Sequence, residues 1–269
     1  MQPETHEESC FCVGAEYAIA DKRFKILSLI WGPTPDFCIY ELENCESLEK
    51  SALKHGKWAD EEFNLEWFAL KIMEGHQGFP KVSHLSQTVP RFMVMQLLGH
   101  SLDDIQNTIF EGKALPAQTI ASIGLQALDR FEALHAQGII QNDIKKTKTA
   151  DLLRIRIGVG FGDEKYILYL MHFSHMRPFE GLNETPFAQC EDLIPLANVL
   201  LSLARDCGKF CPGEPCQYRQ LSCLLDTVEK LQEGPPRYDD MRDLMMELIT
   251  ESGFEYDDKI IFDPHPPAV

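Results

Sequence analysis

Residues 138–148 gather charged side chains that could do chemistry. Asp143 supplies a carboxylate, and Lys145 and Lys148 follow it closely. A carboxylate in such a place can act as a general base and take a proton from a reacting hydroxyl. The alternative is structural, because an aspartate in a loop can also cap and order its own backbone.

Histidine and cysteine residues raise the question of a metal site. His172 and His175 stand three residues apart without a third ligand nearby in the sequence, so packing or surface roles are favoured over metal binding. Four of the nine cysteines crowd one stretch: Cys207, Cys211, Cys216 and Cys223. Their spacing lacks the tight C-x2-C pair typical of structural zinc. Free thiols, one or two disulfides, or a zinc site are the alternatives, in that order of preference.

Composition limits the classes of partner and compartment. Of the 269 residues 44% are hydrophobic, enough for a sizeable core. The net charge of −17 repels phosphate backbones, so no nucleic-acid partner is expected. No apolar run reaches the ~18 residues of a membrane span, and residues 1–12 lack the features of a secretory signal. We therefore expect a cytoplasmic protein, and secretion by an unusual route only if the crowded cysteines form disulfides.

The elements that must position these residues follow from hydrophobic periodicity. Strands are predicted at 24–29, 37–42, 48–54 and 91–98, and a helix at 60–74. Farther along the chain, helices are predicted at 116–137, 190–205, 221–231 and 239–251, and strands at 152–159 and 165–171. Pro195 would lie in the first turn of its helix. This order predicts an α+β chain with an N-terminal sheet lobe, a hinge at 96–99 and a C-terminal helical lobe.

Two stretches of the chain match the pattern of a known family. Residues 91–105 read RFMVMQLLGHSLDDI, and residues 238–263 contain G-F-E-Y-D and I-F-D. They resemble the hinge and the terminal helix of the casein kinase 1 family, and more weakly the related vaccinia-related kinases. The resemblance implies a two-lobed protein-kinase-like fold. Its expected parts are a tail (1–21), an N-terminal lobe with one long helix (22–98), a C-terminal, mainly helical lobe (99–263) and a tail (264–269).

The resemblance assigns roles to residues of a nucleotide pocket. Lys54, in Ala52-Leu53-Lys54, matches the strand lysine that contacts nucleotide phosphates, and Glu66 matches the helix glutamate that pairs with it. The alternative for both is a solvated surface position, and the flanking match favours the pair. Met95 and the hinge backbone at Leu97 and Leu98 would border the base of the nucleotide.

Other parts of the kinase machinery are replaced. The D-F-G position, whose Asp binds magnesium in kinases, falls on His172-Phe173-Ser174, and the magnesium-binding Asn position falls on Lys148. Magnesium prefers oxygen ligands, which neither side chain offers. Of the H-R-D triplet only Asp143 survives, with Lys145 two residues beyond it. Because a base without metal has little to do, we favour the structural role for Asp143.

The phosphate-covering loop and the activation segment also depart from the family. Only Gly32 remains of the glycines expected in 30–37, two prolines remove N–H donors there, and Asp36 adds a repelling charge. Only 17 residues separate Ser174 from Asp192, which resembles the family's Asp that anchors the large helix. The activation segment is therefore expected to be short and to lack the family's substrate platform.

The resemblance with these losses implies a catalytically inactive pseudokinase that acts through protein–protein interaction, as a scaffold, a competitor or an allosteric regulator. A protein partner is expected, with no metal, no other cofactor and no membrane. Two alternatives are kept: a metal-independent nucleotide-sensing switch that binds ATP weakly, and an atypical phosphotransferase that uses Lys54, Glu66 and Asp143. If the pocket is closed, Trp31 and Phe173 are the residues expected to fill it.

Overall fold

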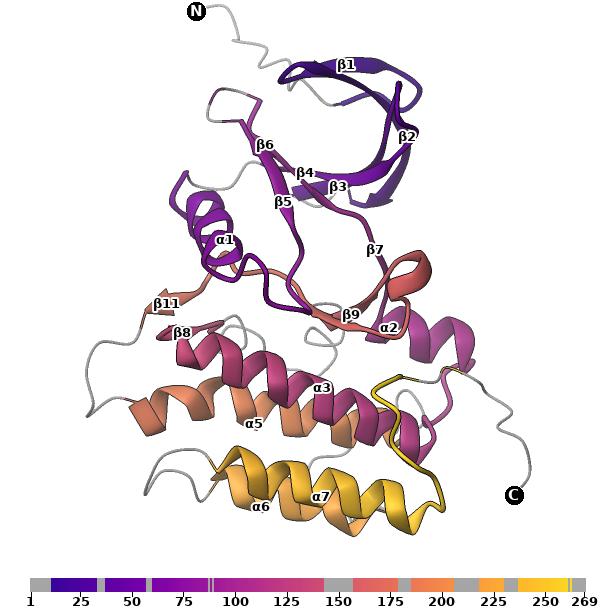
Figure 1. Ribbon diagram of the computed structural model, residues 1–269, viewed down its shortest axis with the longest axis vertical. Coiled ribbons are helices and arrows are strands. Elements are labelled where there is room, and N and C mark those ends of the chain that lie inside the picture. The colour runs from indigo at the N-terminus through magenta and orange to yellow at the C-terminus, as the bar shows by residue number, and fades with distance from the viewer. Residues whose placement is uncertain are drawn as a thin grey trace, which may run out of the picture.

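The chain has an α+β arrangement, with a curled antiparallel sheet at one end and a group of helices at the other (Figure 1). It is seen in a computed structural model that describes residues 11–32, 37–56, 60–86, 88, 90–142, 157–178, 185–205, 218–229, 237–260 and 262. The α+β class predicted from the order of elements is confirmed. In the part of the chain that is described, no helix has both the length and the apolar character needed to cross a bilayer.

The six-stranded sheet carries a small core of its own. Its strands are β1 (Glu16–Ile19), β2 (Lys22–Trp31), β3 (Phe37–Asn44), β4 (Lys50–Gly56), β5 (Val82–Leu85) and β6 (Phe92–Gln96), in the order β1-β2-β3-β4-β6-β5. Alternate residues of β2 and β3 are buried, as the period of a half-buried strand requires, for example Phe24, Ile26, Tyr40 and Leu42. The helix α1 (Asp60–Ile72) lies beside this sheet and contacts β5 (Figure 1).

The N-terminal tail expected at 1–21 is wrong for its second half. β1 pairs with β2 from Glu16↔Lys25 to Ile19↔Lys22. Phe11 is buried among four aromatic rings: Tyr17, Tyr40, His55 and Phe92, with ring centroids 5.0 to 6.1 Å away. Burial of so large an aromatic surface offsets the entropy of ordering this segment.

The expected hinge at 96–99 joins the end of one strand to the start of another. The predicted strand at 91–98 divides, because β6 ends at Gln96 and β7 (Leu98–Ser101) turns to pair with β9 (Ile157–Gly160). β10 (Leu168–Leu170) completes this second sheet. The approach is close at Gly99, where a Cβ atom would lie 2.5 Å from the Gly160 carbonyl oxygen. A glycine is therefore required to join the two parts in this way.

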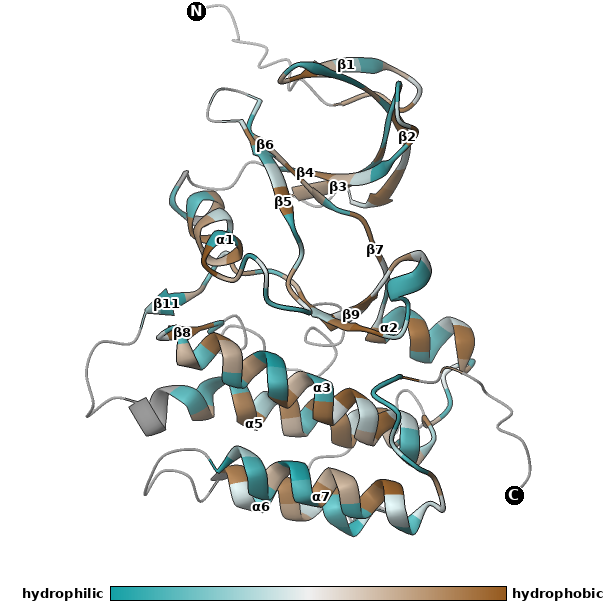
Figure 2. Cartoon of the chain, in the orientation of Figure 1, coloured by the Kyte–Doolittle hydropathy of each residue, from teal (hydrophilic) through white to brown (hydrophobic). Residues whose placement is uncertain are grey.

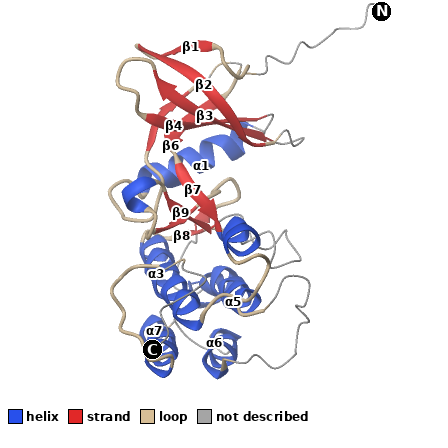
Figure 3. Cartoon of the chain, turned by 90° about the vertical axis from the view of Figure 1, so that its right-hand side faces the viewer, coloured by secondary structure: helices blue, strands red, loops and turns tan. Residues whose placement is uncertain are grey.

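The helices form the other end of the molecule. They are α2 (Leu102–Asp104), the π-helical turn Ile105–Ile109, α3 (Ala117–Ala136), α5 (Thr185–Leu203), α6 (Arg219–Glu229) and α7 (Tyr238–Glu251), and the 3-10 turn Gly162–Glu164 follows β9. α3 packs on α5 and α7, and α6 packs on both of the latter (Figure 3). Along α3 and α7, brown and teal residues alternate in Figure 2, as amphipathic helices require. Gly138 ends α3 in the left-handed region, with a φ of +70°.

The predicted start of the helix at 190–205 is wrong by five residues. α5 begins at Thr185, so Pro195 lies inside the helix instead of in its first turn. The helix continues through the proline because it buries apolar residues on several sides, among them Leu193, Leu196 and Leu200. Before it, β11 (Arg177–Pro178) pairs with β8 (Ile139–Ile140), and residues 179–184 lie outside the described residues.

Candidate nucleotide-pocket site

The predicted Lys54–Glu66 pair is formed and fully buried. The Lys54 ammonium, on β4, donates to Glu66 Oε1 at 2.8 Å and Oε2 at 2.7 Å, on α1. Only 2% of the Lys54 side chain and 1% of the Glu66 side chain are exposed. Because both side chains are buried, the alternative of two solvated surface residues is excluded. The pair ties α1 to the middle of the sheet.

Two further side chains close around the Lys54 ammonium. His172 Nδ1 lies 3.3 Å from Lys54 Nζ, and the centre of the Phe37 ring lies 5.0 Å from the same nitrogen. The Phe37 and His172 rings are in contact, with centroids 5.3 Å apart. An ammonium has three N–H donors, and Glu66 Oε1, Glu66 Oε2 and His172 Nδ1 all lie within hydrogen-bonding distance of it. Nδ1 can accept from the ammonium in the tautomer that carries its proton on Nε2.

The backbone holds His172 in an uncommon conformation. Its φ is +62°, in the left-handed region that favours glycine. Gln141 Nε2 donates to the carbonyls of Met171 at 2.7 Å and His172 at 3.1 Å, which ties both ends of this peptide to the segment after β8. The neighbouring Asn142 is also left-handed, with a φ of +52°. Conformations of this kind persist only where surrounding contacts fix them.

The carboxylate of Asp192, on α5, holds the segment after β8 in place. Its side chain is fully buried and accepts from the backbone N–H groups of Gln141 at 2.8 Å and Asn142 at 3.0 Å. It also accepts from His135 Nε2 at 3.0 Å, and His135 Nδ1 is hydrogen-bonded to the Tyr238 hydroxyl. Burial raises the pKa of Tyr238, and the negative charge of Asp192 raises it further, so the phenol stays neutral and can donate to Nδ1. The resemblance indicated that Asp192 anchors its own helix. The structure adds that the Asp192 carboxylate also accepts from the backbone of the segment after β8.

The remaining predicted pocket residues lie at the junction of the two sheets. Met95 stands on β6 opposite Ala52 of β4, Leu97 lies between β6 and β7, and Leu98 pairs with Gly160. Met95, Leu97 and Leu98 are each partly buried. Asp143, Lys145 and Lys148 lie outside the described residues, so their predicted roles stay predictions.

The two residues expected to fill the pocket lie elsewhere. Trp31 stands at the end of β2 with 41% of its surface exposed. Phe173 is fully buried against Phe79, with ring centroids 6.0 Å apart, in the larger core. Phe37 and His172 cover Lys54 instead. No sequence pattern indicated this contact, because it joins residues far apart in the chain.

The metal alternatives gain no support from the described residues, where no three His, Cys, Asp or Glu side chains gather as ligands would. Cys223 lies on α6 and forms no disulfide there. Cys207, Cys211 and Cys216 lie outside the described residues. The state of the cysteine stretch therefore stays a prediction.

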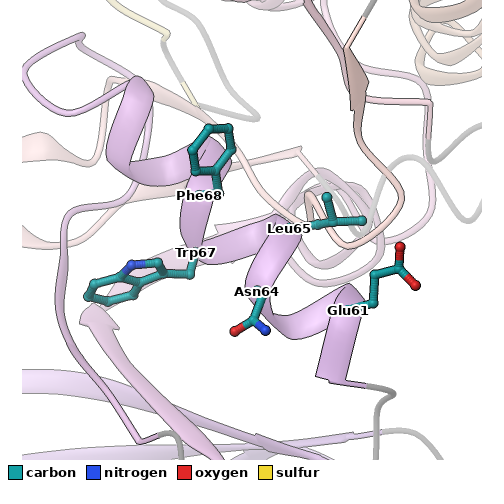
Figure 4. Close-up of a pocket in the computed structure, with 5 residues that line it drawn as sticks. All are labelled: Glu61, Asn64, Leu65, Trp67 and Phe68. Carbon is teal, nitrogen blue, oxygen red and sulfur yellow. The ribbon is translucent and has the colours of Figure 1, made fainter.

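A shallow depression lies on the surface of α1 (Figure 4). Its lining is mainly apolar and comes from one helix: Glu61, Asn64, Leu65, Trp67 and Phe68. Phe68 is 57% exposed, whereas Trp67, which projects from another side of the helix, is partly buried. None of the predicted pocket residues lines this depression, and it holds no group that could do chemistry beyond one carboxylate.

Comparison with known proteins gives partial similarity. No family model matches the chain. Over 81 residues, 30% of the chain, the sequence is 32% identical to casein kinase 1-like protein HD16 of Oryza sativa subsp. japonica. It is 32% identical over 81 residues to casein kinase I homolog 3 of Schizosaccharomyces pombe. The chain spans 11% of the first protein and 18% of the second. These similarities support a casein-kinase-1-like relationship for this chain, and the curled antiparallel sheet is compatible with a kinase-like N-terminal lobe.

Proposed function

We propose that the chain is a two-lobed, casein-kinase-1-like pseudokinase that transfers no phosphate and acts by binding another protein. The observation that carries the proposal is the enclosure of Lys54. The ammonium is hydrogen-bonded to Glu66 and lies 3.3 Å from His172 Nδ1, and the Phe37 ring lies over it. A kinase needs this lysine to reach the nucleotide phosphates.

The chemistry of position 172 supports the same proposal. By the resemblance, His172 stands where a kinase has the aspartate that holds magnesium. Its Nδ1 is already directed at the Lys54 ammonium at 3.3 Å. A magnesium ion prefers carboxylate, phosphate and water oxygens, and it would be repelled by the adjacent ammonium. Transfer would lose the charge neutralisation that metal gives to the phosphoryl group.

A protein partner is proposed on two grounds. The depression on α1 joins the exposed Phe68 to the apolar surface of Leu65 and Trp67, and contiguous exposed apolar surface is typical of protein contacts. The net charge of −17 disfavours nucleic acid. Through such contacts the chain would act as a scaffold, a competitor or an allosteric regulator.

Thermal unfolding with ATP tests the proposal, in separate samples with magnesium, manganese and EDTA. We expect no shift in any of them, since a ligand at ~100 times its dissociation constant would stabilise by about 2.7 kcal/mol. A shift that requires metal, together with transfer of labelled phosphate that Asp143→Asn abolishes, would refute it. A shift of equal size in EDTA would favour the nucleotide-sensing switch.

A further inference from the structure

We propose that Phe37 and His172 form a latch over Lys54, and that opening the latch turns the ammonium into a metal-independent site for nucleotide phosphates. In the closed state the two rings touch each other and both contact the ammonium. The proposal rests on the function proposed above and concerns the regulation of the same site.

The hydrogen bonds of Lys54 indicate which contact gives way. The bonds to Glu66, at 2.8 and 2.7 Å, join opposite charges and are short. The bond to His172, at 3.3 Å, is longer and goes to an imidazole nitrogen. The opposite charges of Lys54 and Glu66 add a Coulomb attraction that the contact with the imidazole lacks. A phosphate oxygen would therefore displace the imidazole and leave the Lys54–Glu66 pair intact.

Phe37 lies against the same ammonium. It is the first residue of β3, and its ring centre lies 5.0 Å from Lys54 Nζ. A ring in this position is attracted to the cation and keeps water from it. Because the same ring packs on His172, the two side chains should open together.

The backbone of His172 makes the closed state releasable. A φ of +62° is strained for histidine and unstrained for glycine. The Gln141 bonds to the Met171 and His172 carbonyls, together with the contacts to Lys54 and Phe37, hold the strained form. His172→Gly removes the imidazole and relieves the strain at once, so it should open the latch without loss of the fold.

Calorimetric titration with ATP in EDTA tests the latch. We expect His172→Gly to bind ATP at least tenfold more tightly than wild type, and His172→Gly with Phe37→Ala to bind more tightly again. Two controls should leave the affinity unchanged. Ala20→Gly relieves a left-handed backbone (φ +52°) that is not at the site, and Met246→Ala removes an exposed apolar side chain of α7.

A triple variant that adds both Lys54→Met and Glu66→Met to His172→Gly should lose the gain in ATP affinity. The latch is refuted if folded His172→Gly binds ATP no more tightly than wild type, or if the gain survives without Lys54 and Glu66. Far-ultraviolet circular dichroism and the unfolding midpoint establish whether each variant is folded. If the variant that combines His172→Gly with Phe37→Ala is not folded, the affinity of His172→Gly alone decides the test. Phosphate transfer by the wild type would refute the proposed function and leave this comparison of affinities unaffected.

Discussion

Removing one partner of the Lys54–Glu66 pair should destabilise the whole fold. Lys54→Met keeps most of the length of the side chain but leaves the Glu66 carboxylate, 1% exposed, without its cation. Glu66→Met leaves the ammonium, 2% exposed, with its charge unbalanced. An uncompensated buried charge costs about 3–5 kcal/mol. Since a domain is stable by about 5–15 kcal/mol in total, either single variant should lose a large share of its stability.

A double variant distinguishes the loss of the whole ion pair from the loss of one of its partners. With Met at both positions no charge is buried, and replacement of a buried ion pair by apolar residues is often neutral or stabilising. We therefore expect Lys54→Met/Glu66→Met to lie close to wild type, although the two single costs would add to about 6–10 kcal/mol. That difference would be the coupling energy of a double-mutant cycle.

Urea unfolding at fixed temperature, followed by tryptophan fluorescence, measures these differences, and thermal scans repeat them. At about 2–4 °C per kcal/mol, a single variant should melt roughly 6–20 °C below wild type. The matched control is Lys71→Met on α1, whose pair with Glu74 is 35% and 56% exposed. An exposed pair contributes about 0–1 kcal/mol. Lys71 also donates to the Val82 carbonyl and lies over the Trp67 ring, so this variant should melt slightly below wild type and well above Lys54→Met.

Two results would refute the reasoning. If Lys54→Met costs no more than Lys71→Met, the pair is not buried in solution. If the single costs simply add, the two charges are not coupled. The expected result has a practical consequence for tests of nucleotide binding, because a kinase uses the corresponding lysine to contact the nucleotide phosphates. Here a loss of function in Lys54→Met would report a loss of folded protein as much as a lost nucleotide contact.

Three other substitutions test the contacts around the site. Asp192→Asn should lower the free energy of unfolding by roughly 3 kcal/mol, because an amide cannot accept from both backbone N–H groups and His135. The control Asp239→Asn, at a side chain that is 96% exposed, should change it by no more than about 0.5 kcal/mol in the same urea titration. Phe11→Ala should lower the free energy of unfolding by about 3–5 kcal/mol, whereas the control Val13→Ala, at a side chain that is 58% exposed, should change it very little. Equal melting points for the two variants would mean that residues 11–19 do not pack on the sheet. Burial, and then a hydrogen bond to a carboxylate, raises the pKa of Tyr169 to about 12. Because the folded pKa lies above the unfolded value of about 10, stability should fall as pH rises from about 10 to 12, and Tyr169→Phe should lessen that fall in alkaline urea titrations.

Local patterns were sufficient for the elements that depend on local chemistry. The strands at 24–29 and 37–42 and the helices at 60–74 and 116–137 were predicted because apolar periodicity and terminal signals coincide there. β1 was missed because it is short and carries few buried side chains of its own. Its stability comes from Phe11 and from distant rings on β3, β4 and β6.

The site divides in the same way. Lys54 and Glu66 could be predicted because they lie within one short stretch and match a motif. The closure by Phe37 and His172 could not, because the bond between Lys54 and His172 spans 118 residues of sequence and depends on a left-handed φ at a histidine. Sequence patterns do not encode such a backbone choice at a residue other than glycine.

The arrangement changes what the survival of kinase-like residues implies. Lys54, Glu66 and Asp192 are each almost fully buried, and each bonds across two or more elements of the fold. The cost of breaking such contacts is reason enough to keep these residues, whether or not a nucleotide ever binds. By the resemblance, His172 stands where a kinase binds metal, and its bond to Lys54 adds to the same buried network. The Lys54–Glu66 pair is therefore evidence for the architecture of this chain, and evidence for nucleotide binding has to come from the ATP titrations of the latch variants.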